Sequence, residues 1–116
     1  MNKEELKKRT KEFAHRCVKL CNSLPKKDIG RLVKGQLLRS STSVSSNYRA
    51  TCVAQSKKSF IAKISIVIEE ADESLFWLEF IIDEALLQNE RVMPLMKEAD
   101  ELVAIFISSR KTASGK

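Results

Sequence analysis

Glycine and proline are scarce in this sequence, with three glycines and two prolines in 116 residues. Because both residues punctuate regular backbone and mark turns, their scarcity argues against a turn-rich β architecture. Hydrophobic residues make up 43% of the chain and charged residues 31%, a balance that also argues against disorder. A chain of this length builds one hydrophobic core rather than two. We expect a single all-α domain.

Long apolar runs are also missing. A membrane-spanning helix needs about 20 consecutive apolar residues. The basic N-terminal residues have no apolar segment behind them that would make a secretory signal. We therefore expect a cytoplasmic protein. The most hydrophobic stretch, residues 64–87, is interrupted by Glu69, Glu70, Asp72, Glu73, Glu79, Asp83 and Glu84.

Residues that carry catalysis or bind metals are few. Cys17 and Cys21 lie one helical turn apart among apolar neighbours, which favours small core residues, and the odd number of cysteines argues against a disulfide framework. The acidic cluster at 69–73 lacks the Glu-x-x-His units of di-metal bundles, and His15 is the only histidine. The S-x-x-K spacing at residues 23–26 has none of its accompanying elements, so chance explains it. We expect no enzyme activity, no metal and no cofactor.

Hydrophobic periodicity predicts four helices. In the first, six residues recur at alternating steps of four and three, which places them on one face: Leu6, Thr10, Phe13, Cys17, Leu20 and Leu24. Pro25 separates the first two helices, and Ser56 provides an N-cap for the third. The expected fold is an antiparallel up-and-down four-helix bundle over residues 1–110, followed by a disordered tail over 111–116. The predicted helices are Asn2–Leu24, Asp28–Cys52, Lys57–Asn89 and Glu90–Ser109.

Each predicted helix has an inner face. The serine-rich stretch 40–46 is the hardest to assign, because Ser and Thr side chains compete for helical backbone hydrogen bonds. It contains neither Gly nor Pro, and its small side chains allow helices to approach closely, so we assign it to the second helix. The inner face predicted for that helix comprises Ile29, Val33, Gln36, Ser40, Val44 and Asn47. The inner face predicted for the third comprises Phe60, Ile64, Val67, Ala71, Leu75, Leu78 and Ile82. The inner face predicted for the fourth comprises Val92, Leu95, Met96, Ala99, Leu102 and Phe106.

The third predicted helix carries more apolar surface than one seam buries. The apolar residues off its inner face would form an aggregation-prone patch on a monomer, so we expect another subunit to cover them. These residues are Ile66, Phe76, Trp77, Phe80 and Ile81.

Charge is unevenly divided along the chain, whose net charge is +6. Residues 1–63 hold 16 Lys and Arg against four Asp and Glu, giving +12, whereas residues 64–116 hold five against eleven, giving −6. Such asymmetry is typical of an anion-binding surface, or of complementary halves that attract one another within the fold or between subunits. The sequence leaves both explanations open.

The outer side of the first two predicted helices is the candidate binding surface. Lys11 and His15 fall there, although an ordinary solvated exterior would look the same. Phosphates need only suitably spaced cations, so the surface is a candidate nucleic-acid footprint even without an aromatic platform or a base-reading motif. The candidate contacts are Lys8, Lys19, Lys27, Arg31, Lys34 and Arg49.

Two segments carry a family resemblance. Residues 36–47, QLLRSSTSVSSN, are similar to the pattern QIRRAAVSIPSN, and residues 58–66, KSFIAKISI, are similar to KEFIRFLSI. Both patterns belong to the four-helix-bundle family of proteins encoded in 23S rRNA intervening sequences, which the chain resembles from Ile29 onward. Ser45 stands where that family usually has proline, and Arg49-Ala50-Thr51 replaces its common A-E-G.

The resemblance implies an antiparallel bundle that assembles as a homo-oligomer, with a ring of five (a pentamer) as the expected stoichiometry. A related branch is similar to the accessory variability determinant of diversity-generating retroelements, a basic ring that works with a reverse transcriptase and its RNA. We therefore expect RNA or a nucleoprotein as partner, with neither a membrane nor a small-molecule substrate. A protein-interaction scaffold that binds no nucleic acid is the alternative. Arg39 and Asn47 are expected to be hydrogen-bonded inside the bundle rather than to contact a ligand.

Overall fold

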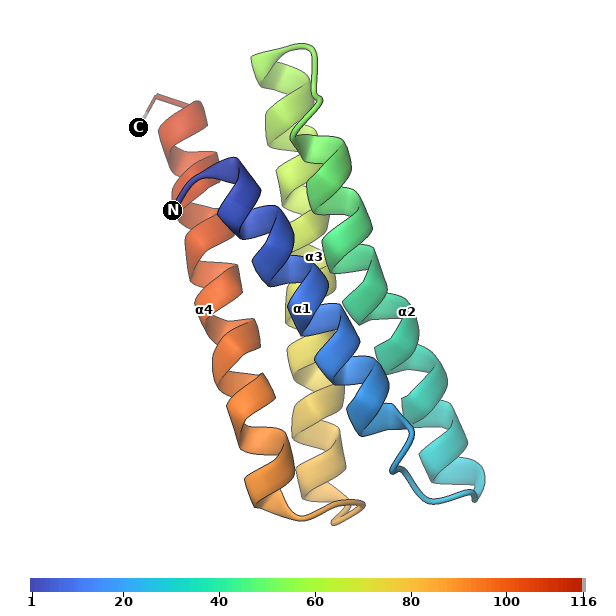
Figure 1. The fold of residues 1–116 in the computed structure, drawn as a ribbon. Helices are drawn as coiled ribbons and strands as arrows, with labels where there is room; N and C mark the ends of the chain where they lie inside the picture. The colour runs from blue at the N-terminus through green and yellow to red at the C-terminus, as the bar shows by residue number, and fades with distance from the viewer. Residues whose placement is uncertain (116) are drawn as a thin grey trace.

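Four helices run antiparallel to their sequence neighbours in the computed structural model of the chain, which describes residues 1–115 (Figure 1). The molecule measures 45 × 20 × 20 Å along its principal axes. Each helix packs against the next in sequence, and α4 closes the bundle against α1. The predicted all-α four-helix bundle is confirmed. The helices are α1 (Lys3–Cys21), α2 (Asp28–Thr51), α3 (Lys57–Asp83) and α4 (Asn89–Ala113).

Local sequence explains where the helices begin and end. Asn2 and Glu5 form a capping box at the start of α1, and the Ser56 side chain accepts a hydrogen bond from the Ser59 amide at the start of α3. The third helix ends before its predicted limit, because Ala85 adopts a positive φ of 51° and starts the connection to α4. The last helix continues to Ala113, three residues into the predicted tail, and Lys116 lies outside the described residues.

Burial in the structure confirms the inner faces predicted for the first and fourth helices. All six residues predicted for the first helix are buried, although Leu24 follows the end of α1. In α4 the predicted stripe from Val92 to Phe106 is buried except for Met96, which is half-buried. Most residues of these stripes are large and apolar, so their periodicity is clear from the sequence.

The inner face predicted for α2 was wrong in part. Leu37, Ser41 and Tyr48 are buried, whereas Ile29, Gln36 and Asn47 are only half-buried. The face is therefore rotated from the predicted one. The physical reason is that serines occupy much of this helix, and a hydroxyl side chain does not reveal whether its position is buried.

Small residues let the helices approach closely. The Ser74 hydroxyl lies within hydrogen-bond distance of the Ser40 hydroxyl across α2 and α3 (3.0 Å) and of the Glu70 carbonyl oxygen (2.9 Å), and its single proton is donated to one of them at a time. A Cβ atom added to Gly30 would lie 1.9 Å from the carbonyl oxygen of Pro25, so only glycine fits there. The serine-rich stretch is helical, as predicted, and Ser40 and Ser41 are its buried hydroxyl residues.

Candidate nucleic-acid interface

An open groove of about 670 Å³ runs between α1 and α2. Cationic or titratable side chains extend from both helices, while Ala14, Val18 and Ser45 are buried or half-buried and form its floor. We call this depression the α1–α2 groove. It is lined by Glu4, Lys7, Lys8, Lys11, Ala14, His15 and Val18 of α1, and by Thr42, Ser45, Ser46 and Arg49 of α2.

Helical spacing places these residues together. On α1 the lining positions recur at steps of three and four, along the side adjacent to the buried stripe that contains Phe13. On α2 the same steps carry Thr42, Ser45 and Arg49 to the facing side. The groove stays open because its floor residues, Ala14 among them, are small; larger aliphatic side chains at these positions would fill the space between α1 and α2.

The electrostatic balance of the groove is positive. Lys7 pairs with Glu4 at 3.1 Å, an exposed i,i+3 pair on one helix. Within residues 1–115, Lys8, Lys11 and Arg49 form no ion pair. Their charges therefore face solvent without a neutralising carboxylate, as a polyanion requires.

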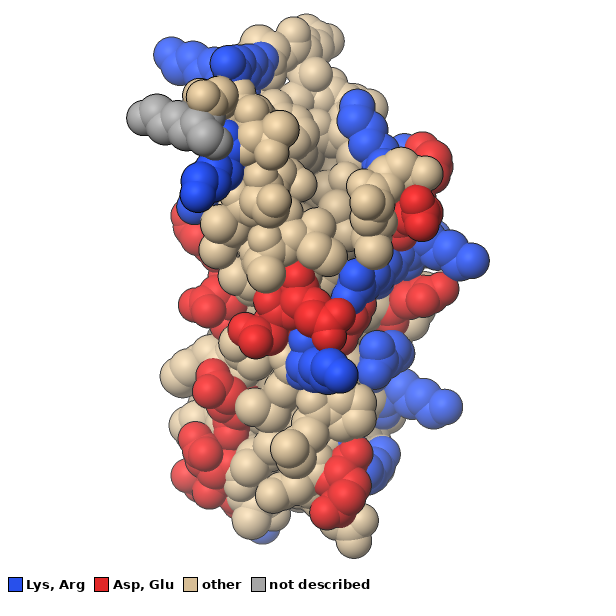
Figure 2. All heavy atoms as spheres, turned by 90° about the vertical axis from the view of Figure 1, so that its left-hand side faces the viewer, with Lys and Arg blue, Asp and Glu red and all other residues tan. Residues whose placement is uncertain are grey.

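The opposite side of α1 is neutralised by α4. Arg9 donates hydrogen bonds to Glu98 (2.7 Å) and Glu101 (2.9 Å), and these carboxylates raise the pKa of its guanidinium further above its ordinary value. Figure 2 shows the side of the molecule on which α4 lies: acidic side chains cross its middle and follow one edge, whereas basic ones gather along the other edge and at one end. A polyanion would therefore be directed away from α4.

The structure brings two of the six predicted nucleic-acid contacts, Lys8 and Arg49, into the groove. The other four lie nearer the α1–α2 connection. Lys27 is the N-cap residue of α2, and Arg31 pairs with Asp28 at 3.5 Å and donates to the Lys26 carbonyl oxygen at 3.3 Å. Lys34 lies beside Cys21 near the end of α1, and Lys19 is exposed on α1.

Three groove residues were absent from the predicted contacts. Lys7, Lys11 and His15 line the groove with Lys8. Lys11 and His15 could have been predicted as contacts, because the sequence already placed both on the outer side of the first helix and they lie at helical spacing from Lys8. What the sequence lacked was the rotation of α1 against α2, which decides whether an outer side is a plain surface or the wall of a groove.

An aromatic cluster lies on the outer side of α3. The ring centroids of Phe76 and Trp77 are 4.9 Å apart, and those of Trp77 and Phe80 are 5.6 Å apart. Phe76 is 51% exposed and Ile66 is 46% exposed, whereas Trp77 and Phe80 are half-buried. Ile81 is fully buried in the core, so its prediction as an interface residue was wrong. It occupies the inner position predicted for Ile82, because three consecutive apolar residues do not show which of them faces inward.

Ion pairs seal the α2–α3 seam beside this cluster. The guanidinium of Arg39 donates to Glu70 at 2.9 Å and to Glu73, and the Trp77 indole N–H donates to Glu73 at 3.3 Å. The hydrogen bond from Arg39 lowers the pKa of the Glu73 carboxyl. Arg39 is thus hydrogen-bonded as predicted, but on the surface rather than inside the bundle. Asn47 is half-buried and donates to the Ser43 carbonyl oxygen of its own helix at 2.9 Å.

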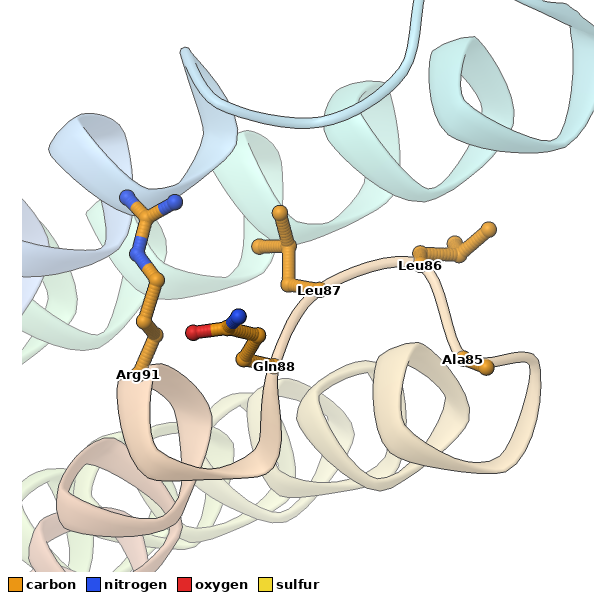
Figure 3. Close-up of a pocket in the computed structure, with 5 residues that line it drawn as sticks. All are labelled: Ala85, Leu86, Leu87, Gln88 and Arg91. Carbon is orange, nitrogen blue, oxygen red and sulfur yellow. The ribbon is translucent and has the colours of Figure 1, made fainter.

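A second cavity, of about 570 Å³, lies at the connection between α3 and α4. It is lined by residues 85–88 and Arg91, and Figure 3 shows Leu87 and Arg91 pointing toward the connection that follows α1. Arg91 donates to the Ser23 hydroxyl at 2.7 Å. The guanidinium therefore joins the first turn of α4 to the connection that follows α1, and no other titratable group lines the cavity.

The described residues contain no cluster of three or more His, Cys, Asp or Glu that would hold a metal ion. Burial raises the pKa of the Cys17 thiol to about 12 and that of Cys21 to about 11, so neither forms the reactive thiolate at neutral pH. Over residues 1–115, no helix has the length and hydropathy to cross a bilayer.

Comparisons with known proteins match this fold along nearly the whole chain. The sequence profile of the family described as 23S rRNA-intervening sequence protein matches residues 2–108, which extends the resemblance across α1. A similar solved structure is described as a protein of unknown function from the S23 ribosomal protein family of Bacteroides thetaiotaomicron VPI-5482; it is 32% identical, has a TM-score of 0.87, and the alignment covers 96% of this chain and 99% of that one. No curated protein shows a significant match. The chain therefore belongs to the family of 23S rRNA-intervening sequence proteins.

Proposed function

We propose that this protein is a non-enzymatic homo-oligomeric bundle that binds RNA, alone or in a nucleoprotein, through the basic side of α1 and α2. The observation that supports it is the α1–α2 groove, where Lys8, Lys11 and Arg49 converge without ion-pair partners among the described residues. Cations placed this way bind phosphates irrespective of base sequence. The relation to the accessory variability determinant stays a prediction.

The oligomeric part of the proposal is supported by the aromatic cluster on α3. Phe76 and Ile66 expose large apolar side chains on the outer side of a helix whose inner side already packs in the core. Such surface is typical of subunit interfaces. A cyclic assembly is the simplest closed arrangement, and the family resemblance favours a ring of five.

A filter-binding assay with mixed RNA at two salt concentrations tests RNA binding. The groove variant replaces Lys8, Lys11 and Arg49 together with Gln. A control variant replaces Lys57, Lys58 and Lys97 with Gln, which removes equal charge from exposed positions outside the groove. We expect the groove variant to bind weakly and to lose about 0.7 to 0.9 from the slope of log K against log salt for each phosphate contact removed. Equal effects of both variants would contradict a localised site.

The unequal charge of the two halves supports a second candidate function, a protein-interaction scaffold. In that case the basic side of one subunit would contact the acidic α3 and α4 surfaces of the next. The groove variant would then lower the mass of the assembly in light scattering. An unchanged mass together with lost RNA binding would reject the scaffold.

A further inference from the structure

We infer that the α1–α2 groove accommodates a single nucleic-acid strand rather than a duplex. The inference rests on the proposed RNA binding and specifies the form of RNA that fits this site.

The groove has cations on both of its walls, which favours a narrow ligand lying between them. Lys8 and Lys11 extend from α1 and Arg49 from α2, with buried or half-buried floor residues between them. A narrow chain lying between the walls would place its phosphates within reach of both helices and fill the depression. A duplex has a convex surface of paired strands, so it would rest on the rims and leave the floor empty. The groove geometry therefore favours one strand.

The floor has the chemistry of a sugar-phosphate chain rather than that of a peptide. The side-chain hydroxyl of Ser45 forms no hydrogen bond with another described residue, so it is available to a phosphate or a ribose 2′-OH. Ala14 and Val18 supply small apolar contacts to a sugar. Docked peptides and proteins depend on pockets for large aromatic or aliphatic anchors. The groove has small residues in place of such a pocket, which favours a strand over an acidic peptide.

The remaining contacts predict short and sequence-tolerant recognition. His15 provides one ring on which a base can stack, and stacking accepts every base. The lining residues of α1 run from Glu4 to Val18, about 21 Å of helix at the standard rise. Such a length suits a footprint on the order of four nucleotides, the low end of single-strand binding sites.

The test compares a labelled uridine oligomer with an RNA duplex of equal length at low salt, by fluorescence anisotropy. We expect the single strand to bind at least about tenfold more tightly, although the duplex carries twice the phosphates. Ser45→Leu fills the groove without changing its charge, and should reduce single-strand affinity while leaving weak duplex binding unchanged. Ala104→Leu, on the exposed side of α4, is the matched control. Thermal melting of each variant establishes that it folds, and Thr42→Leu serves as a second groove-filling variant if Ser45→Leu does not.

Each other outcome overturns the inference in a distinguishable way. Equal or tighter duplex binding, still reduced in the groove variant, would reject the single strand and keep RNA binding. Unchanged single-strand affinity in a folded Ser45→Leu protein would place the strand elsewhere. Displacement of the oligomer by polyglutamate at equal charge concentration would show that the groove recognises any polyanion. Absence of binding to either RNA would reject the proposed function as well.

Discussion

The second helix, α2, packs against α1 on one side and against α3 on the other, and the two seams are filled differently. Against α1, the seam is an open groove with small residues on its floor and cations on its walls. Against α3, Arg39 spans the seam to Glu70 and Glu73, and the Trp77 indole N–H donates to the same Glu73 carboxylate. The seam beside α1 is thus open and positive, whereas the seam beside α3 is neutralised by ion pairs and lies next to the aromatic cluster of α3. Under the proposed function, the first side would bind a polyanion and the second would contact another subunit.

The aromatic side gives the largest expected effect. Phe76→Glu should reduce the mass of the protein from several chains to one, because a carboxylate placed in an apolar interface loses its hydration. Phe76 is more than half exposed in the single chain, so folding should survive. Light scattering after gel filtration measures the mass. Ile107→Glu, an exposed apolar position on α4, is the control; a monomeric wild-type protein would refute the oligomer.

The corrected inner face of α2 predicts the next largest effect. Leu37→Ala removes a fully buried side chain and should lower the free energy of unfolding by about 2–5 kcal/mol. Gln36→Ala, at the half-buried neighbouring position, should change it by less than about 0.5 kcal/mol. Urea unfolding measures both. Similar losses of unfolding free energy in the two variants would contradict the corrected inner face of α2.

The basic side divides into the groove and the region near the α1–α2 connection. Replacing Lys27, Arg31 and Lys34 together with Gln should weaken RNA binding by less than about threefold, since Arg31 is already paired with Asp28. The groove variant should weaken it by about tenfold or more. Filter binding with both variants ranks the two regions by their contribution to RNA affinity. The reverse order would move the footprint toward the connection.

The serine seam predicts two small effects of opposite sign. Ser40→Ala removes the hydrogen bond between the Ser40 and Ser74 hydroxyls and should cost about 1 kcal/mol of stability. The buried Ser41 hydroxyl has no hydrogen-bond partner among the described residues, and the thiol of Cys17 beside it is at best a weak one. Ser41→Ala should therefore be neutral or stabilising in the same unfolding measurement. A clear loss of stability in Ser41→Ala would show that this hydroxyl is bonded.

The smallest effect concerns the ion pairs between α2 and α3. Because the folded state lowers the pKa of Glu73, its stabilising contribution is present above the unfolded pKa of about 4.3 and is lost as pH falls through the lower folded pKa. Partial exposure limits this contribution to less than about 1 kcal/mol. Urea unfolding of the wild type and Glu73→Gln should differ at neutral pH and converge once the pH has fallen below the folded pKa of Glu73. A difference that persists there would assign the effect to packing.

Large apolar residues made most of the fold predictable. The stripes of the first and fourth helices contain Leu, Phe and Val at helical spacing, and the structure keeps them buried. The face of α2 was harder because Ser40 and Ser41 are fully buried while most of the neighbouring hydroxyl residues are exposed or half-buried, a difference that hydropathy does not record. The Arg39–Glu73 pair joins residues 34 positions apart and has no local signature.

The groove was predictable in its charges but not in its shape. Lys8 and Arg49 were recognised as cations on outer faces, and their common location depends on how α1 is rotated against α2. That rotation is set by packing of the whole core. The sequence therefore supported a basic surface, and only the structure supplied the two facing walls.

Lysine footprinting tests the central claim, RNA binding in the α1–α2 groove, most directly. The protein is acetylated with and without a saturating uridine oligomer, and modified lysines are quantified by mass spectrometry. The account predicts that RNA protects Lys8 and Lys11 while Lys57, Lys58 and Lys97, exposed outside the groove, react as before. Protection of the latter three with unchanged reactivity at Lys8 and Lys11 would contradict it.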